Sequence, residues 1–374
     1  MNSTDRYNQF RSIGYFGSLD ALRCLAIVAV IWQHSPAIPH DAMPLTDAGA
    51  SGVALFFVLS GFLITTLLLR EDEGTGGISL RNFYMRRTLR IFPLYYAVLG
   101  LYALLVALLE HNAAGRLFFQ NLPYYLTYTT NWFVDLKLNE DGQRRVIFVF
   151  AWSLATEEQF YLFWPPIMKF CRRAVAISIL LAVVFVDLAL TFAFGIVDVP
   201  ETTVQRLLRI AQSPSTEICF GVLLAIALHA KAGFAAAWRV LGKQWSAPAT
   251  LVLLAAIAMW PGGATPGWYL AQAMALTAFL AACVIREDHG VAAFLTTPFL
   301  ARVGVVSYGM YLLHMLSVNS VKVIFARIGV ESAPALFVLA VLAAYFSAEM
   351  SYRLFESPIL RLKKRFGSRQ TVGR

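Results

Sequence analysis

The chain has 374 residues, of which 58% are hydrophobic and only 14% are charged. Soluble proteins carry roughly 45–50% apolar and about 25% charged residues, so this composition excludes an ordinary soluble enzyme and indicates a polytopic membrane protein. The formal net charge of +9 does not indicate nucleic-acid binding, because the basic residues flank apolar runs, where the positive-inside rule accounts for them.

Ten apolar runs recur along the chain, each near the ~20 residues that a membrane-spanning helix needs. They lie at approximately 19–37, 50–70, 89–109, 146–168, 174–195, 213–230, 247–262, 267–285, 303–326 and 334–355. We expect an all-α bundle of about ten transmembrane helices that forms one membrane domain over residues 1–374. The aromatic segment 117–133 is interrupted by Asn, Thr and Pro, which favours an interfacial or re-entrant piece.

Lys and Arg residues are distributed unevenly among the connections. The even-numbered connections are the basic ones, near 70–90, 169–173, 231–243 and 286–302. The connections at 36–50 and 261–267 contain no Lys or Arg. The positive-inside rule therefore predicts that both termini are cytoplasmic, with 1–18 as a polar tail and 356–374 as a basic tail. No cleavage site of small residues follows the first apolar run, so we expect that helix to be retained.

The first span reads LDALRCLAIVAVIWQH and carries Arg23 in its cytoplasmic half and His34 at its outer end. Eleven helical residues turn through about 1100°, so the two side chains lie about 20° apart around the axis and roughly 16 Å apart along it. An arginine in a span costs at least ~2.5 kcal/mol, so Arg23 should face the bundle interior. His34 can act as a general base. The alternatives are an interfacial histidine and an arginine that reaches the headgroups.

A second cluster lies at the start of the third span. In NFYMRRTLRIFPLYY (82–96), Arg87 and Arg90 are three residues apart and share a helix face, and Arg86 adds charge beside them. These arginines could hold a multiply phosphorylated ligand that arrives from the cytoplasm. They could equally be topology signals that flank the span.

Acidic residues enter the fourth span. Glu157 and Glu158 lie in FAWSLATEEQFYLFWPP (150–166), in the outer half of that span and at the depth predicted for His34. A carboxylate beside His34 would fix the imidazole tautomer and raise its basicity. The alternative is a structural ion pair with an arginine of another helix.

The remaining polar residues within the spans favour structural roles. His314 lies in the middle of the ninth span, where a packed, hydrogen-bonded histidine is the common case. Glu349 and Arg353 are four residues apart and are expected to pair. The four cysteines have no paired spacing, so we expect neither disulfides nor a metal site.

Taken together, these motifs resemble the membrane-bound acyltransferase-3 family over essentially the whole chain. The matching stretches are LDALR with Asp20, the Arg23-x10-His34 spacing, GVALFFVLSGFLI with Ser60, Arg87-x-x-Arg90, WSLATEEQFY with Trp152, Ser153, Glu157 and Tyr161, SYGMYLLH with His314, and FESP with Glu356. Ala21 stands where the family has Gly, and Ala54 stands where many members have Asp, which weakens any role for a carboxylate at position 54. We expect a stand-alone version without the esterase-like domain that some members append.

The resemblance implies an O-acyltransferase of the bacterial cytoplasmic (inner) membrane. The acyl group, expected to be acetyl, would pass from acyl-CoA to a hydroxyl of a carbohydrate or glycolipid, such as an envelope or surface polysaccharide. His34 would be the general base and Glu157 would orient it, while Arg23 would line the donor channel. The donor phosphates would be held by Arg86, Arg87 and Arg90. Acyl-CoA is a co-substrate, and no permanently bound cofactor, metal or nucleic acid is expected; the oligomeric state is open.

Two other classes of function are compatible with the same residues. A transporter or flippase of a lipid-linked sugar or small anion is one, since charge pairs within the membrane also mark ion pathways. A non-catalytic partner in an envelope assembly is the other.

Overall fold

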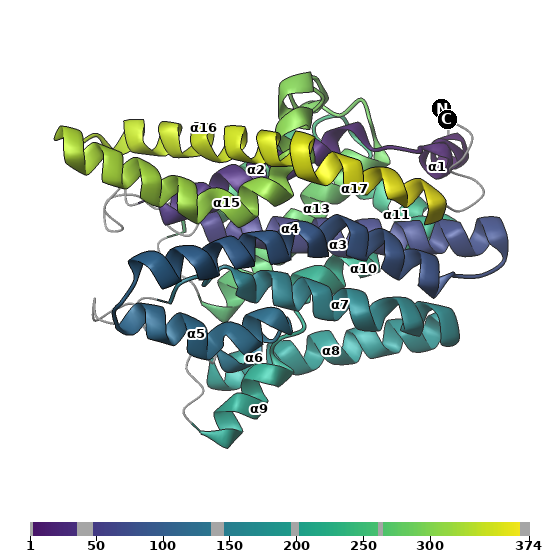
Figure 1. Cartoon of the computed structure of the whole chain (residues 1–374). Coiled ribbons are helices and arrows are strands. Elements are labelled where there is room, and N and C mark those ends of the chain that lie inside the picture. Colours follow the sequence, from purple (N-terminus) through teal and green to yellow (C-terminus); the bar gives the residue numbers. More distant parts are fainter. Residues whose placement is uncertain (1–2, 36–47, 136–145, 196–201, 261–264, 367–374) are drawn as a thin grey trace. The chain divides into compact units, whose positions relative to one another are not determined.

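The computed structural model describes residues 3–35, 48–135, 146–195, 202–260 and 265–366, and all regular structure in these residues is helical (Figure 1). The longer helices are α2 (Gly17–His34), α3 (Ala48–Thr75), α4 (Leu80–Leu109), α7 (Ala151–Phe170), α8 (Arg173–Phe194), α10 (Thr216–His229), α12 (Ser246–Ala258), α13 (Pro266–Ile285), α15 (Pro298–Ile328) and α16 (Ala333–Ser351). The shorter elements are α1 (Ser3–Ser12), α5 (Ala113–Leu126), α6 (Thr130–Phe133), α9 (Thr203–Ala211), α11 (Lys231–Leu241), α14 (Ala292–Leu295), the π-helical turn η1 (Tyr352–Glu356), α17 (Ser357–Arg361) and the 3₁₀ segment η2 (Leu362–Phe366).

Each predicted apolar run coincides with one of the longer helices. Seven helical segments are long and apolar enough to cross a membrane, or up to nine when two bent helix pairs each count as one span. Helix α7 is not among these, because Glu157, Glu158 and Gln159 lower its hydropathy. The described residues therefore support seven to nine spans, and the count of about ten stays a prediction. The orientation of the termini stays a prediction, and most of the connections 36–50 and 261–267 lies outside the described residues.

The last helical span is longer than its apolar run. The sequence predicts its end near residue 355, but the helix continues through η1 and α17 to Arg361. The beginning of the predicted C-terminal tail is therefore helical. The part of that tail beyond Phe366 lies outside the described residues.

The aromatic segment 117–133 forms most of α5 and all of α6. Helix α5 has 14 residues, so it rises about 21 Å, which is less than the ~30 Å thickness of the hydrocarbon core. After α5 the chain passes through Tyr128 in a left-handed conformation, with φ of 53°. The hydroxyl of Thr130 then donates back to the carbonyl of Tyr124 at 3.4 Å. The segment is thus a short helix followed by a turn, and a re-entrant or interfacial location stays a prediction.

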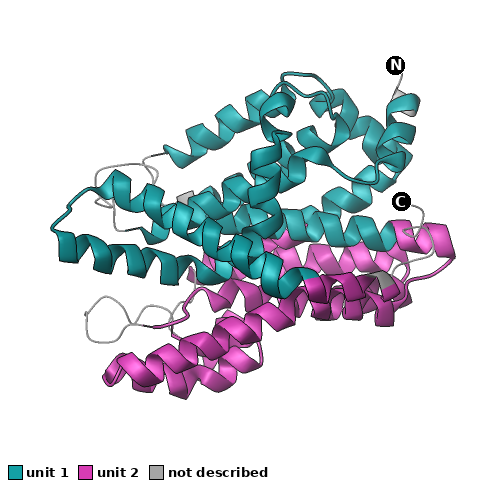
Figure 2. Cartoon of the chain, turned by 45° about the horizontal axis from the view of Figure 1, so that its top comes forward, with its two compact units in different colours: residues 1–69, 220–357 teal, residues 70–219, 358–374 magenta. Residues whose placement is uncertain are grey.

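The described helices divide into two compact units (Figure 2). Unit 1 comprises residues 1–69 and 220–357, and unit 2 comprises residues 70–219 and 358–374. The boundaries fall within α3, within α10 and after Ser357. A single membrane domain over 1–374 stays the prediction for the chain as a whole.

In unit 1, α15 packs along α2. Gly304 of α15 lies against the backbone of α2, where a Cβ atom would come within 1.8 Å of the carbonyl oxygen of Asp20. Only glycine permits an approach this close. Further along both helices, the ring of His34 meets the ring of His314, so α2 and α15 run in the same direction.

Helix α16 packs against α15 and is tied to it by Glu349. Arg302 of α15 donates from Nε and Nη2 to the two carboxylate oxygens of Glu349, at 2.9 and 2.7 Å. Arg353 donates to the same carboxylate at 2.5 Å. The predicted Glu349–Arg353 pair is thus confirmed, and Arg302 adds a bidentate pair that the sequence did not predict.

The core of unit 1 is apolar and draws on several helices. Its fully buried side chains include Phe10 of α1, Leu22 of α2, Phe62 of α3, Phe234 of α11 and Leu280 of α13. This burial anchors the start of α2, which carries two of the predicted site residues.

In unit 2, α4 and α7 run antiparallel. Tyr84 near the start of α4 donates its hydroxyl to the carbonyl of Leu162 at 2.7 Å, and Tyr102 near the end of α4 packs on Phe150 with ring centroids 6.1 Å apart. The contact at Leu162 has a local cause. Pro166, four residues later, has no N–H group, so this carbonyl loses its helical donor and accepts from Tyr84 instead.

Candidate active site

Two histidines meet where the C-terminal end of α2 lies beside the middle of α15. The ring centroids of His34 and His314 are 4.9 Å apart, with an interplanar angle of 67°. His314 is fully buried and His34 is partly buried. The sequence favoured a packed, hydrogen-bonded His314, which the structure confirms, and its ring also contacts that of the predicted base.

Each of these imidazoles is held by a carbonyl of its own helix. Nδ1 of His34 lies 2.9 Å from the carbonyl oxygen of Val30, and Nδ1 of His314 lies 2.6 Å from that of Tyr311. A carbonyl oxygen can only accept, so Nδ1 carries the proton in each neutral ring and Nε2 keeps a lone pair. Nε2 of His34 is therefore the nitrogen that can take a proton from a hydroxyl.

The carbonyl of Val30 fixes the tautomer that Glu157 was predicted to fix. A residue four positions earlier in α2 therefore holds Nδ1 of His34 and sets its tautomer. A direct contact between Glu157 and His34 stays a prediction.

Toward the other end of α2, Arg23 forms an ion pair with Asp20, three residues earlier. The hydroxyl of Tyr15 donates to the second carboxylate oxygen of Asp20 at 2.6 Å. Asp20 is buried, and a buried carboxylate needs such partners.

Because α2 is uninterrupted from Gly17 to His34, Arg23 and His34 share one helix face as predicted. The role of Arg23 in a donor channel stays a prediction.

In unit 2, the Arg87 side chain of α4 lies over the ring of Tyr161 of α7. The guanidinium carbon is 4.0 Å from the ring centroid, and the Tyr161 hydroxyl contacts the carboxylate of Glu157, one turn earlier. The sequence placed Arg87 and Glu157 in opposite halves of the bundle, and the structure brings both side chains to the same tyrosine. Their depths in the membrane stay a prediction. Helix α4 begins at Leu80, well before its apolar run, so Arg87 lies within the helix.

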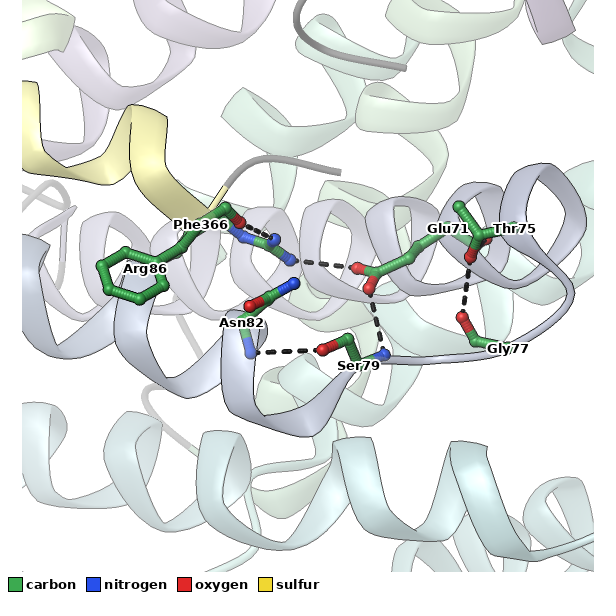
Figure 3. A network of polar contacts seen from close by, with 7 residues as sticks. All are labelled: Glu71, Thr75, Gly77, Ser79, Asn82, Arg86 and Phe366. Carbon is green, nitrogen blue, oxygen red and sulfur yellow. Dashed lines mark hydrogen bonds and ion pairs between the residues drawn. The ribbon is translucent and has the colours of Figure 1, made fainter. Parts of the chain in front are cut away.

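Arg86 belongs to a polar network that joins α3, α4 and the C-terminal segment (Figure 3). Its Nη2 donates to Glu71 at 3.0 Å, and its Nη1 donates to the backbone carbonyl of Phe366 at 2.7 Å. Glu71 also accepts from the backbone N–H of Ser79 at 3.0 Å. Ser79 caps α4 by accepting from the N–H of Asn82. Arg86 therefore has a protein partner on each side, whatever else it binds.

Lys363 is a neighbour of these arginines that sequence analysis did not single out. It lies on η2, which packs against α4. Burial first, and then repulsion by Arg90, Arg87 and Arg86, lowers the pKa of the Lys363 ammonium group from its usual 10.5 to about 7. The signal in the sequence was a basic tail, which topology already explained. Only the packing of the tail on α4 shows which lysine joins the arginines.

With these two groups of residues placed, comparison with known proteins is informative. A family model for the acyltransferase-3 group, described as "Acyltransferase domain", matches residues 16–349. The chain belongs to the acyltransferase-3 family. The motifs predicted this family membership.

Named relatives of this acyltransferase-3 chain are O-acetyltransferases. It is 27% identical over 376 residues to the peptidoglycan O-acetyltransferase OatA of Listeria monocytogenes. The aligned region covers 96% of this chain and 57% of that protein. It is 31% identical over 176 residues to the O-acetyltransferase OatA of Staphylococcus aureus, with 44% of this chain and 26% of that protein covered. The chain thus spans at most little more than half the length of these relatives. No solved structure matches it.

The remaining acyltransferase-3 motif positions lie on α3, α7 and η1. Ser60 is on α3, and Trp152 and Ser153 are in the first turn of α7, where the Ser153 hydroxyl donates to the carbonyl of Phe150 at 3.1 Å. Glu356 ends η1 and accepts from the hydroxyl of Ser351 at 3.4 Å. These contacts stabilise helix ends, and any part in binding or catalysis stays a prediction.

A buried amide network beside the WSLATEEQFY motif was missed by sequence analysis. Asn131 and Gln159 exchange hydrogen bonds at 3.0 and 2.9 Å, and the Asn131 amide also lies 3.2 Å from the hydroxyl of Thr156. Gln159 donates to the carbonyl of Tyr128 at 2.8 Å as well. These bonds hold α6 and the Tyr128 turn against the segment of α7 that carries Glu157.

Proposed function

We propose that the chain is an integral-membrane O-acyltransferase that moves an acyl group, preferentially acetyl, from acyl-CoA to a hydroxyl of a cell-envelope carbohydrate or glycolipid. The observation that supports this best is the tautomer of His34, whose Nδ1 donates to Val30 and whose Nε2 keeps a lone pair. The Listeria relative is named for peptidoglycan, so a glycan of that kind is the acceptor to test first.

The chemistry needs one base that later acts as an acid. Nε2 of His34 takes the proton of the acceptor hydroxyl while the hydroxyl oxygen attacks the carbonyl carbon of the thioester. The tetrahedral intermediate then expels the thiolate as its C–S bond breaks, and the proton returns from His34 to give free CoA. General-base assistance of this kind contributes about 10²–10⁴-fold, and positioning of the two substrates supplies the rest.

The donor side of the reaction falls to the arginines. Guanidinium groups bind phosphates through paired N–H donors, and we assign this role to Arg87 and Arg90, with Arg86 beside them and Arg23 lining the path of the pantetheine arm. Glu157 supports the site through its contact with Tyr161. In this scheme acyl-CoA arrives from the cytoplasm, where both termini lie, and the acceptor is modified at the outer face of the bacterial cytoplasmic membrane.

Replacement of His34 tests the proposal. His34→Ala, reconstituted in proteoliposomes with acetyl-CoA labelled in the acetyl group and an envelope glycan acceptor, should lose acyl transfer by at least ~100-fold. Its affinity for CoA should change little. Ser35→Ala is the matched control, because the Ser35 hydroxyl donates only within its own helix, to Ile31 at 2.8 Å. Persistent acyl transfer by His34→Ala would refute the general-base role.

The same assay separates the enzyme from the other two classes. A transporter would move the lipid-linked sugar without forming an acylated product, and a non-catalytic partner would do neither. Membership of an acyltransferase family favours the enzyme, and formation of a labelled ester by the purified wild-type chain would decide for it.

A further inference from the structure

The C-terminal segment of the described chain is fixed against the first turns of α4. Segment η2 (Leu362–Phe366) packs on α4, and the carbonyl of Phe366 accepts from Nη1 of Arg86 at 2.7 Å. The other end of that guanidinium is held by Glu71 at 3.0 Å (Figure 3). Arg86 thus acts as a clamp between the end of α3 and the C-terminal segment.

The contact between Arg86 and the C-terminal segment brings the positive charge of Lys363 close to the arginines of α4. The ammonium group of Lys363 interacts unfavourably with Arg86, Arg87 and Arg90 of α4. All four belong to unit 2. A tail held only for stability would gain from an acid or an apolar residue at position 363, so stability does not explain the lysine.

Arg87 gives an independent indication of a ligand. Its guanidinium lies over the Tyr161 ring, and a contact through the face of the group uses no N–H donor. The carboxyl group of Glu158 also interacts electrostatically with Arg87. Within the residues that the structure describes, the buried Nε–H of Arg87 meets no acceptor. A buried charged donor of this kind calls for an anionic acceptor.

We propose that Lys363 is part of the donor-binding site, where it joins Arg87 and Arg90 around a polyphosphate while Arg86 clamps the C-terminal segment in place. The inference deepens the proposed function and rests on its acyl-CoA donor, since the diphosphate and the ribose phosphate of CoA supply several anionic oxygens. A phosphate in this position would pair with Lys363 and would accept from Arg87. The C-terminal segment would then be a component of the donor site and not only a topology signal.

Binding of the soluble phosphate part of the donor tests the inference. The full chain in nanodiscs of neutral phosphatidylcholine is titrated with adenosine 3′,5′-bisphosphate and, separately, with CoA. Lys363→Met should weaken the affinity for both by about 10-fold or more, as expected for the loss of one charge-assisted contact, whereas Lys363→Arg should largely preserve it. Lys243→Met, at an exposed position, is the matched control and should have no effect.

The clamp is tested by a double-mutant cycle. Arg86→Ala should weaken bisphosphate binding in the wild-type background, because it releases the segment that carries Lys363. It should have much less effect in the Lys363→Met background, because there the segment no longer contributes. Fully additive effects would overturn the clamp. A thermal unfolding temperature for Lys363→Met equal to or above that of the wild type shows that the variant is folded.

An anionic lipid headgroup offers the same phosphate chemistry, so the titration is repeated with phosphatidylglycerol in the nanodiscs. Unchanged bisphosphate affinity in Lys363→Met, together with loss of lipid that co-purifies with the protein, would overturn the inference and assign the cluster to the membrane surface. Equal affinities of the wild type and Lys363→Met for CoA would also overturn the role of Lys363. That result would leave acyl-CoA as the proposed donor. Binding of inorganic pyrophosphate but not CoA by the wild type, lost in Lys363→Met, would support the polyphosphate site and refute the donor assignment.

Discussion

The imidazole rings of His34 and His314 lie with their centroids 4.9 Å apart, although 280 positions separate them in the sequence. Both rings donate Nδ1–H to a carbonyl of their own helix, so neither can rotate without breaking a hydrogen bond. The contact further restricts the ring of His34. We therefore expect His314 to be a positioning residue for the base proposed above.

Removal of the His314 ring should impair the chemical step more than binding. We expect His314→Ala to lower kcat by about 10–100-fold, the range that a small misplacement of a catalytic group can cause, and to leave KM for acyl-CoA within about 2-fold. His314→Phe should recover part of the loss, because it restores packing against His34. Ser317→Ala is the control, since the Ser317 hydroxyl donates within α15 to Leu313 at 3.1 Å. Unchanged kcat in His314→Ala would exclude the positioning role.

The close approach of α2 and α15 should depend on Gly304. We expect Gly304→Ala to lower the free energy of unfolding by about 1–3 kcal/mol or more, because its Cβ would lie 1.8 Å from a backbone atom that cannot move independently. The same substitution at Gly100 meets nothing within 4 Å and should raise helix stability by about 0.5–1 kcal/mol. Thermal unfolding in detergent compares the two variants. Equal stability would show that the helices can separate at little cost.

The two arginines that share Glu349 should differ in importance. Arg302 makes two hydrogen bonds to the carboxylate and its side chain is 36% exposed, whereas Arg353 makes one and is 72% exposed. We expect Arg302→Ala to cost about 1–3 kcal/mol of unfolding free energy and Arg353→Ala at most about 0.5 kcal/mol. Denaturant titration of both variants measures the difference, and the reverse order would contradict the assignment of Arg302 as the principal partner.

Local patterns in the sequence predicted the positions of the longer helices and the residues that share one helix face. The apolar runs located the longer helices, and the spacing of Arg23 and His34 placed both on one face of α2, because each depends only on neighbouring residues. The Glu349–Arg353 pair was predicted for the same reason. Membrane spans were harder to predict where charged residues enter a helix, as in α7. Charged side chains lower the hydropathy of the helix even when they face the interior of a bundle and not the lipid.

Contacts between distant segments could not be predicted in this way. The hydrophobic periodicity of α2 and α15 does not indicate that His314 faces His34. In the same way, no local pattern indicates that Tyr161 connects Arg87 to Glu157, or that Lys363 packs against α4. Each contact depends on which helices are neighbours and on how far a helix extends beyond its apolar run. The early start of α4 placed Arg87 within the helix, where it reaches Tyr161, and the continuation of α16 into α17 carried Lys363 to the arginines.

Acid should destabilise unit 1 through His289. This histidine follows α13, is 3% exposed, and lies with Nε2 3.0 Å from the hydroxyl of Ser18. Burial lowers its pKa below 6.5, although the charge of Asp288 acts in the opposite direction. The unfolded chain therefore binds more protons as pH falls below about 6.5, and stability decreases, by at most ~1.4 kcal/mol per pH unit for one group.

His289→Gln should remove part of that pH dependence. Thermal unfolding measured between pH 7.5 and pH 5 should have a shallower slope in this variant than in the wild type. The exposed residue His111 provides the control, because His111→Gln should retain the wild-type slope. An unchanged slope in His289→Gln would assign the acid sensitivity to other groups.

Bisphosphate binding should weaken as the pH rises through the range in which Lys363 titrates. Burial, and then the repulsion by Arg90, Arg87 and Arg86, lowers the Lys363 pKa to about 7 in the free protein. The ammonium form predominates below that pH, and above it the ligand must recruit a proton, so affinity should fall by up to about 10-fold per pH unit. The phosphate groups of the ligand themselves lose protons near pH 6, which acts in the opposite direction. Lys363→Arg keeps its charge throughout and measures that second effect alone. Isothermal titration from pH 6 to pH 9 should therefore show a difference between wild type and Lys363→Arg that grows above pH 7, and parallel curves would remove Lys363 from the site.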